Sequence, residues 1–252
     1  MENHRVPQCS EMSHERDAAD WRHPPRGVKI SATMTRRLTR LTGVAFAVTI
    51  LVSEVLKGDS PSPTGPASEI VSFFADHRST ILAGAYVQML ALFLLALLFA
   101  TVAEDVMPES SIAGRLARLG LILTLTAYTT YVFLTAALAF GAATDATPET
   151  AKSLWEIRFV SETFVYFPVA LLIGSVAFAV RPGLTRPWYR WGSLATAAIF
   201  LAGGAALTRN GFFAPDGGYG IILFWLLPVW VAVTGFVATP RLVTSSPAHV
   251  TG

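Results

Sequence analysis

The sequence predicts an all-α, polytopic membrane protein: a transmembrane helix bundle of about six spans with the N- and C-termini cytoplasmic. Three observations predict it. Of the 252 residues, 52% are hydrophobic and only 14% are charged, whereas soluble domains carry about 25% charged residues. The hydrophobic residues form long uncharged blocks, close to the roughly 20 residues that cross a bilayer as a helix. Arginine residues gather in alternate connections, which gives each span a direction.

Six apolar blocks are separated by polar connections. In lipid they must be helices, because every backbone polar group needs a partner within its own segment. The segment ALFLLALLFA also lacks the alternation of a barrel strand. The first block is the weakest span, because it carries Glu54 close to its end. The expected spans are about residues 38–57, 80–103, 117–143, 159–180, 190–208 and 218–239.

The orientation follows from the basic residues of the connections. With the N-terminus inside, the cytoplasmic connections contain the arginine clusters at 36–40, 115–118 and 181–190, and the outer connections contain fewer basic residues. Trp188 and Trp191 flank the last cluster, where aromatic residues meet lipid headgroups. We therefore expect a multi-pass protein of a bacterial plasma (inner) membrane.

The two ends of the chain are polar. Residues 1–35 are mixed in charge and lack an apolar period, which predicts a disordered N-terminal tail. Met34 opens a basic run that leads into the first block, so we expect native translation to start there, with the preceding residues as an extension. No apolar stretch precedes Arg36, so a signal peptide is not expected. Residues 36–240 form the membrane domain, and 241–252 a short cytoplasmic tail.

Two outer connections have structure of their own. Residues 58–66 are a spacer rich in proline and serine. After it, apolar residues share one face of a short predicted interfacial helix: Ile70, Val71, Phe73 and Phe74, opposite Glu69, Ser72 and Asp76. Residues 144–157 are polar and compatible with a helix, and Thr147-Pro148-Glu149 is typical of a helix start.

The distribution of reactive side chains excludes several kinds of site. All five histidines lie outside the predicted spans, and the single cysteine, Cys9, lies in the tail. An intramembrane haem with histidine ligands, a buried His/Cys metal site and a disulfide are thereby excluded. No histidine or lysine within a span could activate a serine, and no GxxxxGK loop is present. We expect no cofactor, no metal and no catalytic residue, and enzymatic activity is disfavoured.

Ionisable and amide side chains near the outer ends of the spans are the remaining lead, because they are costly in a membrane unless paired or hydrated. Glu54 is followed three residues later by Lys57, and Arg158 and Glu162 lie four apart on one helical face. The topology places them all in the outer leaflet. The candidate ligand or ion vestibule comprises Glu54, Gln88, Arg158, Glu162, Arg209 and Asp216.

We favour a purely structural role for these side chains over a ligand or ion site. Charged side chains near helix ends often extend to the headgroups, and buried polar groups often only join helices. Arg158 and Glu162 then form a local ion pair. The third span carries several Thr and Tyr residues, among them Tyr128, Tyr131 and Thr135. Their hydroxyls either bond to carbonyls of their own helix or form a polar seam facing the bundle centre.

Three segments carry a resemblance: RRLTRLTG before the first span, PASEIVSFFADHRSTILAG leading into the second, and RNGFFAPDGGYG before the last. Over about residues 36–240 the chain resembles uncharacterised multi-span membrane proteins of high-GC Gram-positive bacteria. The resemblance implies a helical bundle and no particular activity.

Three functions remain open. The first is a non-enzymatic membrane component that binds a partner protein or lipid, with membrane lipids and either a membrane protein or a second copy of the chain as partners. The alternative is a small transporter or channel with an outward-facing polar vestibule, ranked second because the inner halves of the spans are almost purely apolar. An intramembrane enzyme comes last, for lack of bases and nucleophiles. The net charge of +2 is too small to indicate nucleic acid.

Overall fold

The computed structural model describes residues 32–142, 147–180, 187–205, 211–212 and 217–237. Within these ranges every regular element is a helix. The elements are α1 (Ala32–Lys57), α2 (Ala67–Asp76), α3 (Arg78–Val106), α4 (Ile112–Ala137), the π-helical turn η2 (Leu138–Ala142), α6 (Pro148–Ala179), α7 (Pro187–Ala205) and α8 (Gly218–Val237). Helix α1 thus includes the last residues of the predicted tail. The predictions for residues 1–31 and 241–252 lie outside the described ranges.

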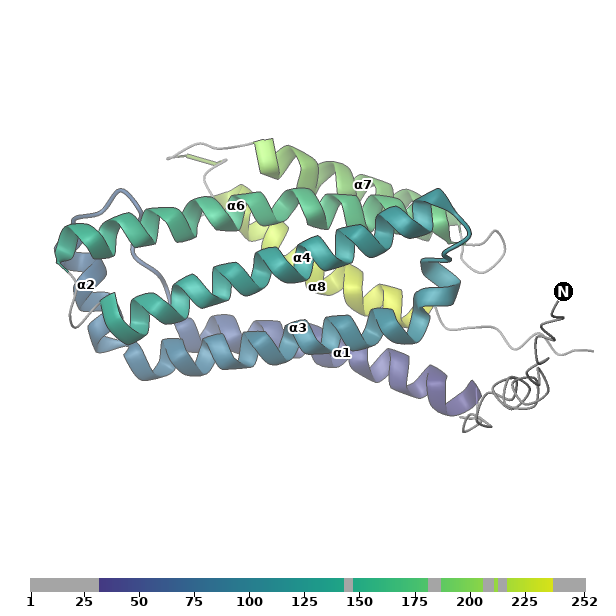
Figure 1. The fold of residues 1–252 in the computed structure, drawn as a ribbon, viewed down its shortest axis with the longest axis horizontal. Coiled ribbons are helices and arrows are strands. Elements are labelled where there is room, and N and C mark those ends of the chain that lie inside the picture. Colours follow the sequence, from purple (N-terminus) through teal and green to yellow (C-terminus); the bar gives the residue numbers. More distant parts are fainter. Residues whose placement is uncertain (1–31, 143–146, 181–186, 206–210, 213–216, 238–252) are drawn as a thin grey trace, which may run out of the picture. The chain divides into compact units, whose positions relative to one another are not determined.

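Six long helices form a closed ring. Each packs against the next in the order α1, α3, α4, α6, α7 and α8, and α8 returns to α1 (Figure 1). The short helix α2 lies against α6 and η2 at one end of the ring, the end labelled α2 in Figure 1. The ring order follows the chain order, as expected for helices joined by short connections.

Five of the described helices are long and apolar enough to cross a membrane. They are Met34–Lys57, Arg78–Val106, Ile112–Gly141, Pro148–Ala179 and Gly218–Val237. The remaining predicted span, 190–208, corresponds to α7, which is helical but is not among the five. Helix α7 has only 19 residues, and it begins with Pro187, Trp188, Tyr189 and Arg190, which lower its hydropathy.

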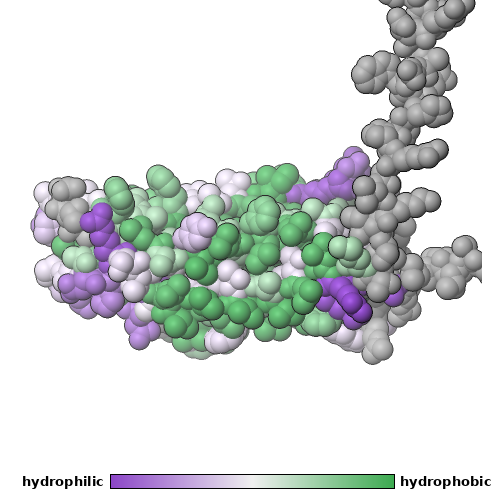
Figure 2. All heavy atoms as spheres, turned by 90° about the horizontal axis from the view of Figure 1, so that it is seen from below, coloured by the Kyte–Doolittle hydropathy of each residue, from purple (hydrophilic) through white to green (hydrophobic). Residues whose placement is uncertain are grey.

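The outward faces of the long helices are apolar. Val48, Phe93, Ile122 and Phe164 are each more than half exposed, although they lie in the middle parts of their helices. Figure 2 shows apolar residues along the body of the bundle and hydrophilic ones toward both ends. Monomeric soluble proteins rarely expose continuous apolar surface of this kind. The surface therefore suits surroundings of hydrocarbon.

Helix α6 begins earlier than the predicted fourth span. The side chain of Thr147 accepts a hydrogen bond from the backbone N–H of Thr150 (3.3 Å), and Pro148 occupies the first turn. Both features are typical of a helix start, and they confirm the start predicted from this tripeptide. The polar residues after Pro148 extend the helix outward beyond the apolar block, so Arg158 and Glu162 lie well inside α6. The short helix after residue 66 is also confirmed, with Ile70 and Phe74 buried.

Glycines let neighbouring helices approach closely. A Cβ atom at Gly120 of α4 would lie 2.6 Å from the backbone nitrogen of Leu172 on α6. At the contact of α1 with α8, a Cβ atom at Gly235 would lie 3.0 Å from the carbonyl oxygen of Thr39 and 3.4 Å from Cα of Gly43. Small residues at such crossings allow tight packing between membrane helices. These contacts hold the ring together around its interior.

Candidate functional site

The last residue of α1 turns into the ring. The Lys57 side chain is 5% exposed. Its ammonium nitrogen lies 2.5 Å from Oε1 of Glu54 and donates to Oε1 of Gln88 on α3 over 3.0 Å. The spacing of three residues places Glu54 and Lys57 on one face of α1. The pair therefore faces α3 from inside the bundle.

A glycine makes room for this lysine. Ser53 on α1 donates a hydrogen bond to the carbonyl oxygen of Gly84 on α3 (3.0 Å). A Cβ atom at Gly84 would stand 2.7 Å from Cγ of Lys57 and 3.0 Å from the carbonyl oxygen of Ser53. The absence of a side chain at Gly84 thus lets α1 and α3 meet while the lysine stem passes between them.

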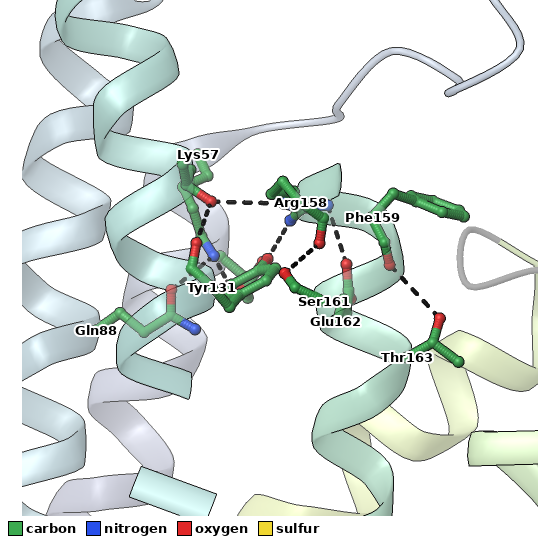
Figure 3. A network of polar contacts seen from close by, with 10 residues as sticks. Lys57, Gln88, Tyr131, Arg158, Phe159, Ser161, Glu162 and Thr163 are labelled. Carbon is green, nitrogen blue, oxygen red and sulfur yellow. Dashed lines mark hydrogen bonds and ion pairs between the residues drawn. The ribbon is translucent and has the colours of Figure 1, made fainter. Parts of the chain in front are cut away.

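Arg158 on α6 is the second buried cation. Its guanidinium lies 2.9 Å from Oε2 of Glu162, donates to the hydroxyl oxygen of Tyr131, and donates through Nε to Oγ1 of Thr135 (3.4 Å) (Figure 3). It also stacks on two rings, 4.3 Å from the centroid of Tyr131 and 4.5 Å from that of Trp155. Removing a charge from water is expensive unless it is paired and hydrogen-bonded. These partners satisfy that condition.

Tyr131 joins the two cations. The ammonium of Lys57 lies 5.5 Å from the centroid of the Tyr131 ring, and the guanidinium of Arg158 lies 4.3 Å from the same centroid. The result is one connected set of side chains from α1, α3, α4 and α6, which we call the ion-pair cluster. Its members are Glu54, Lys57, Gln88, Tyr131, Arg158 and Glu162. Two carboxylates and two cations make it neutral as a whole.

A cavity of about 60 Å³ lies beside the cluster, inside the ring. Its walls come from α1, α3, α4, α6 and α8, and the cations Lys57 and Arg158 do not line it. At about 10–15 Å³ per water position, this volume suits roughly four to six water-sized groups. Its polar lining consists of Glu54, Gln88, Tyr128, Tyr131, Glu162 and Tyr166.

Several of these polar groups have no hydrogen-bond partner among the described residues. The carbonyl oxygen of Gln88 faces Lys57, with its amide nitrogen on the other side (Figure 3). Among the described residues, that amide nitrogen and the hydroxyls of Tyr128 and Tyr166 form no hydrogen bond, although Gln88 is 3% and Tyr166 7% exposed. A buried polar group left unpaired costs about 1–3 kcal/mol. A hydrogen-bonding occupant of the cavity would offset that cost.

A smaller cavity of about 20 Å³ lies on the other side of the cluster, toward α2. Glu54 lines both cavities, and Lys57 and Arg158 line this one. Phe74 of α2 lies at its wall, with its ring 5.4 Å from that of Trp155 and nearly edge-on. Helix α2 therefore covers the ion-pair cluster at its end of the bundle.

The structure brings four of the six predicted vestibule residues together. Glu54, Gln88 and Glu162 line the larger cavity, and Arg158 stands behind Glu162. These side chains lie in the interior of the ring, with 35% of Glu54 and 30% of Glu162 exposed. The remaining two, Arg209 and Asp216, lie outside the described residues.

The predicted vestibule did not include Lys57, although the sequence analysis noted it three residues after Glu54, because the last residue before a polar connection resembles a loop lysine. The sequence also left open whether the hydroxyls of the third span bond to carbonyls of their own helix or face the bundle centre. There, Tyr128, Tyr131 and Thr135 face the cavity or the cluster. By contrast, Thr126 and Thr130 are exposed and donate to carbonyls one turn earlier, over 2.9 and 3.0 Å. Both interpretations of the seam thus apply, and Thr135 on the inner face combines them, since it also donates to the carbonyl oxygen of Tyr131 over 3.0 Å.

Within the described ranges, no group of three His, Cys, Asp or Glu side chains could hold a metal ion. The comparisons with known proteins found no matching family, curated protein or solved structure. The role of the site is therefore inferred from its geometry.

Proposed function

We propose that this protein is a multi-pass protein of a bacterial plasma membrane that binds a small polar solute in an outward-facing cavity, as a small transporter does. One observation carries the proposal: the cavity inside the ring is lined by polar groups that make no hydrogen bond within the described part of the chain, namely the Gln88 amide nitrogen and the hydroxyls of Tyr128 and Tyr166. Ligand sites in membrane bundles are built in this way, from facing helices with a few convergent polar groups.

The proposed topology has six spans, with α7 as the fifth along the chain. Exposed Trp188 and Trp191 at the start of α7 support this, because tryptophans are enriched at membrane interfaces. An even number of spans keeps both termini on one side, and the arginine clusters favour the cytoplasm for that side. The end of α1 at Lys57, with α2 and the start of α6, then faces outward.

The cavity would exchange solute with the outer side. On the inner side of the cavity, the ring is filled with fully buried apolar side chains: Leu95, Leu98, Phe99, Leu172 and Val176. Such a core offers no polar path, so the proposed state is occluded from the cytoplasm. Release on that side would need the helices to rearrange, as in alternating access.

A partner-binding component without a solute is the weaker alternative, because the polar groups concerned lie inside the ring, where a protein partner would not reach them. Intramembrane catalysis is weaker still. The two cations closest to the cavity are already engaged by carboxylates, and neither Lys57 nor Arg158 lines it.

Cysteine accessibility tests the proposal directly, because the chain has a single native cysteine. In a Cys9→Ser background, Gln88→Cys places a thiol at the cavity. A membrane-impermeant methanethiosulfonate is then added to intact cells. We expect rapid modification of Gln88→Cys, measured by the loss of later labelling with a fluorescent maleimide.

The matched control is Leu98→Cys, which lies on the same helix, is fully buried and does not line the cavity. It should stay unmodified. If Gln88→Cys were as unreactive as Leu98→Cys, or reacted only in inside-out vesicles, the outward-facing cavity would be ruled out. A reporter fused after Gly252 that is active outside the cell would overturn the six-span topology.

A further inference from the structure

Both hydrogen-bond acceptors and hydrogen-bond donors line the cavity. Oε1 of Glu54 is engaged by Lys57, and Oε2 of Glu162 by Arg158, while both carboxylates still line the cavity. The amide N–H groups of Gln88 and the hydroxyls of Tyr128 and Tyr166, which make no hydrogen bond to any described residue, are donors. An occupant that satisfies both sets needs at least one donor group and one acceptor group.

The net charge of the ion-pair cluster also limits which kind of solute the cavity can bind. Each carboxylate at the cavity already has a buried cation behind it, so the ion-pair cluster is neutral. An anion would face two carboxylates, and a cation would bring a positive charge into a site whose negative charges are already compensated. Uncompensated charge in a low-dielectric interior is strongly unfavourable. A molecule with both charges and no net charge avoids this cost.

We infer that the cavity takes a small zwitterion, an amino-acid-like molecule of about five non-hydrogen atoms, the size that the 60 Å³ volume allows. Its ammonium group would lie beside Glu54 and Glu162. Its carboxylate would accept hydrogen bonds from Gln88 and Tyr166. The inference rests on the proposed function, since it names the class of solute for the same cavity.

Glycine is the first probe, because it has both charges and the required size. The full chain, purified in detergent, is equilibrated with radiolabelled glycine by dialysis. We expect saturable binding that unlabelled glycine and β-alanine reduce. Ethylammonium and propionate, which carry one charge each, and the uncharged ethylene glycol should not compete at the same concentrations.

Tyr166→Phe is the decisive variant. It removes a hydroxyl that has no hydrogen-bond partner among the described residues, so the fold should be unaffected. The loss of one hydrogen bond to a charged group should weaken glycine binding about tenfold or more. The matched control is Tyr189→Phe: this buried hydroxyl pairs with Thr234 (2.8 Å) away from the cavity, so its loss should lower stability and leave glycine binding unchanged.

The outcomes separate the two proposals. If no zwitterion binds, if ethylammonium or propionate binds instead, or if Tyr166→Phe binds glycine as well as the wild type does, the inference is wrong. In those cases, modification of Gln88→Cys from outside the cell would still uphold the outward-facing polar cavity. Absence of that modification would remove the proposed function as well.

Discussion

The ammonium of Lys57 donates to the side-chain carbonyl of Gln88 over 3.0 Å and so sets the orientation of that amide. Since an ammonium group can only donate, the carbonyl oxygen must face it, and the amide N–H groups are left toward the cavity. One contact between α1 and α3 thereby joins the stability of the bundle to the polarity of its interior.

The first prediction concerns this contact. Lys57→Met and Gln88→Leu should each lower the free energy of unfolding, and the double variant should lose less than the sum of the two. A hydrogen bond to a charged group contributes about 1.5–3 kcal/mol, and that is the coupling energy expected from the double-mutant cycle. Unfolding in mixed detergent micelles gives the measurement. Strictly additive losses would show that the contact does not form.

Arg158→Met should be among the most damaging single changes in the protein. It leaves Glu162 and the hydroxyl of Tyr131 without their buried partner. Breaking a buried ion pair costs about 3–5 kcal/mol, and the partial exposure of Glu162 places the expected loss near the lower limit. The double change Arg158→Met with Glu162→Gln should recover part of it. A thermal midpoint equal to that of the wild type would contradict the burial of this arginine.

Gly120→Ala should destabilise the contact of α4 with α6. The added methyl group would lie 2.6 Å from a backbone nitrogen that cannot move aside alone, and overpacking of this kind typically costs about 1–3 kcal/mol. Gly192→Ala is the matched control, because nothing lies within 4 Å of its Cβ position and alanine is the better helix former. Thermal unfolding should show a lower midpoint for the first variant and an equal or higher one for the second.

Thr124→Val should stabilise the protein. The Thr124 hydroxyl is buried and has no hydrogen-bond partner in the described part of the chain, and replacing such a group by an apolar one of similar shape removes its desolvation cost. The gain should be about 1 kcal/mol, or about 2–4 °C in the thermal midpoint. Thr234→Val provides the contrast, since that hydroxyl bonds with Tyr189 and with the carbonyl of Trp230. A fall in the midpoint for Thr124→Val would show that its hydroxyl is satisfied.

The helical bundle could be predicted from the sequence because hydrocarbon imposes simple requirements of length and apolarity. The similar depth of Glu54, Gln88 and Glu162 along the bundle also followed from counting residues. Their meeting around one cavity did not, because it depends on the rotation of each helix within the ring. For the same reason, the inward position of Lys57 could not be predicted. Whether a lysine at a helix end turns inward depends on the space across the interface, which Gly84 provides here.

The contact between α1 and α8 has a consequence for biosynthesis. In the proposed membrane topology, a ribosome would deliver α1 to the membrane first and α8 last, yet the backbones of the two helices lie close together at Gly43 and Gly235. Until synthesis is nearly complete, the Gly43 face of α1 must be covered by lipid or by an insertion factor. A chain that terminates before residue 218 would keep that face open, which makes it a natural substrate for quality-control proteases.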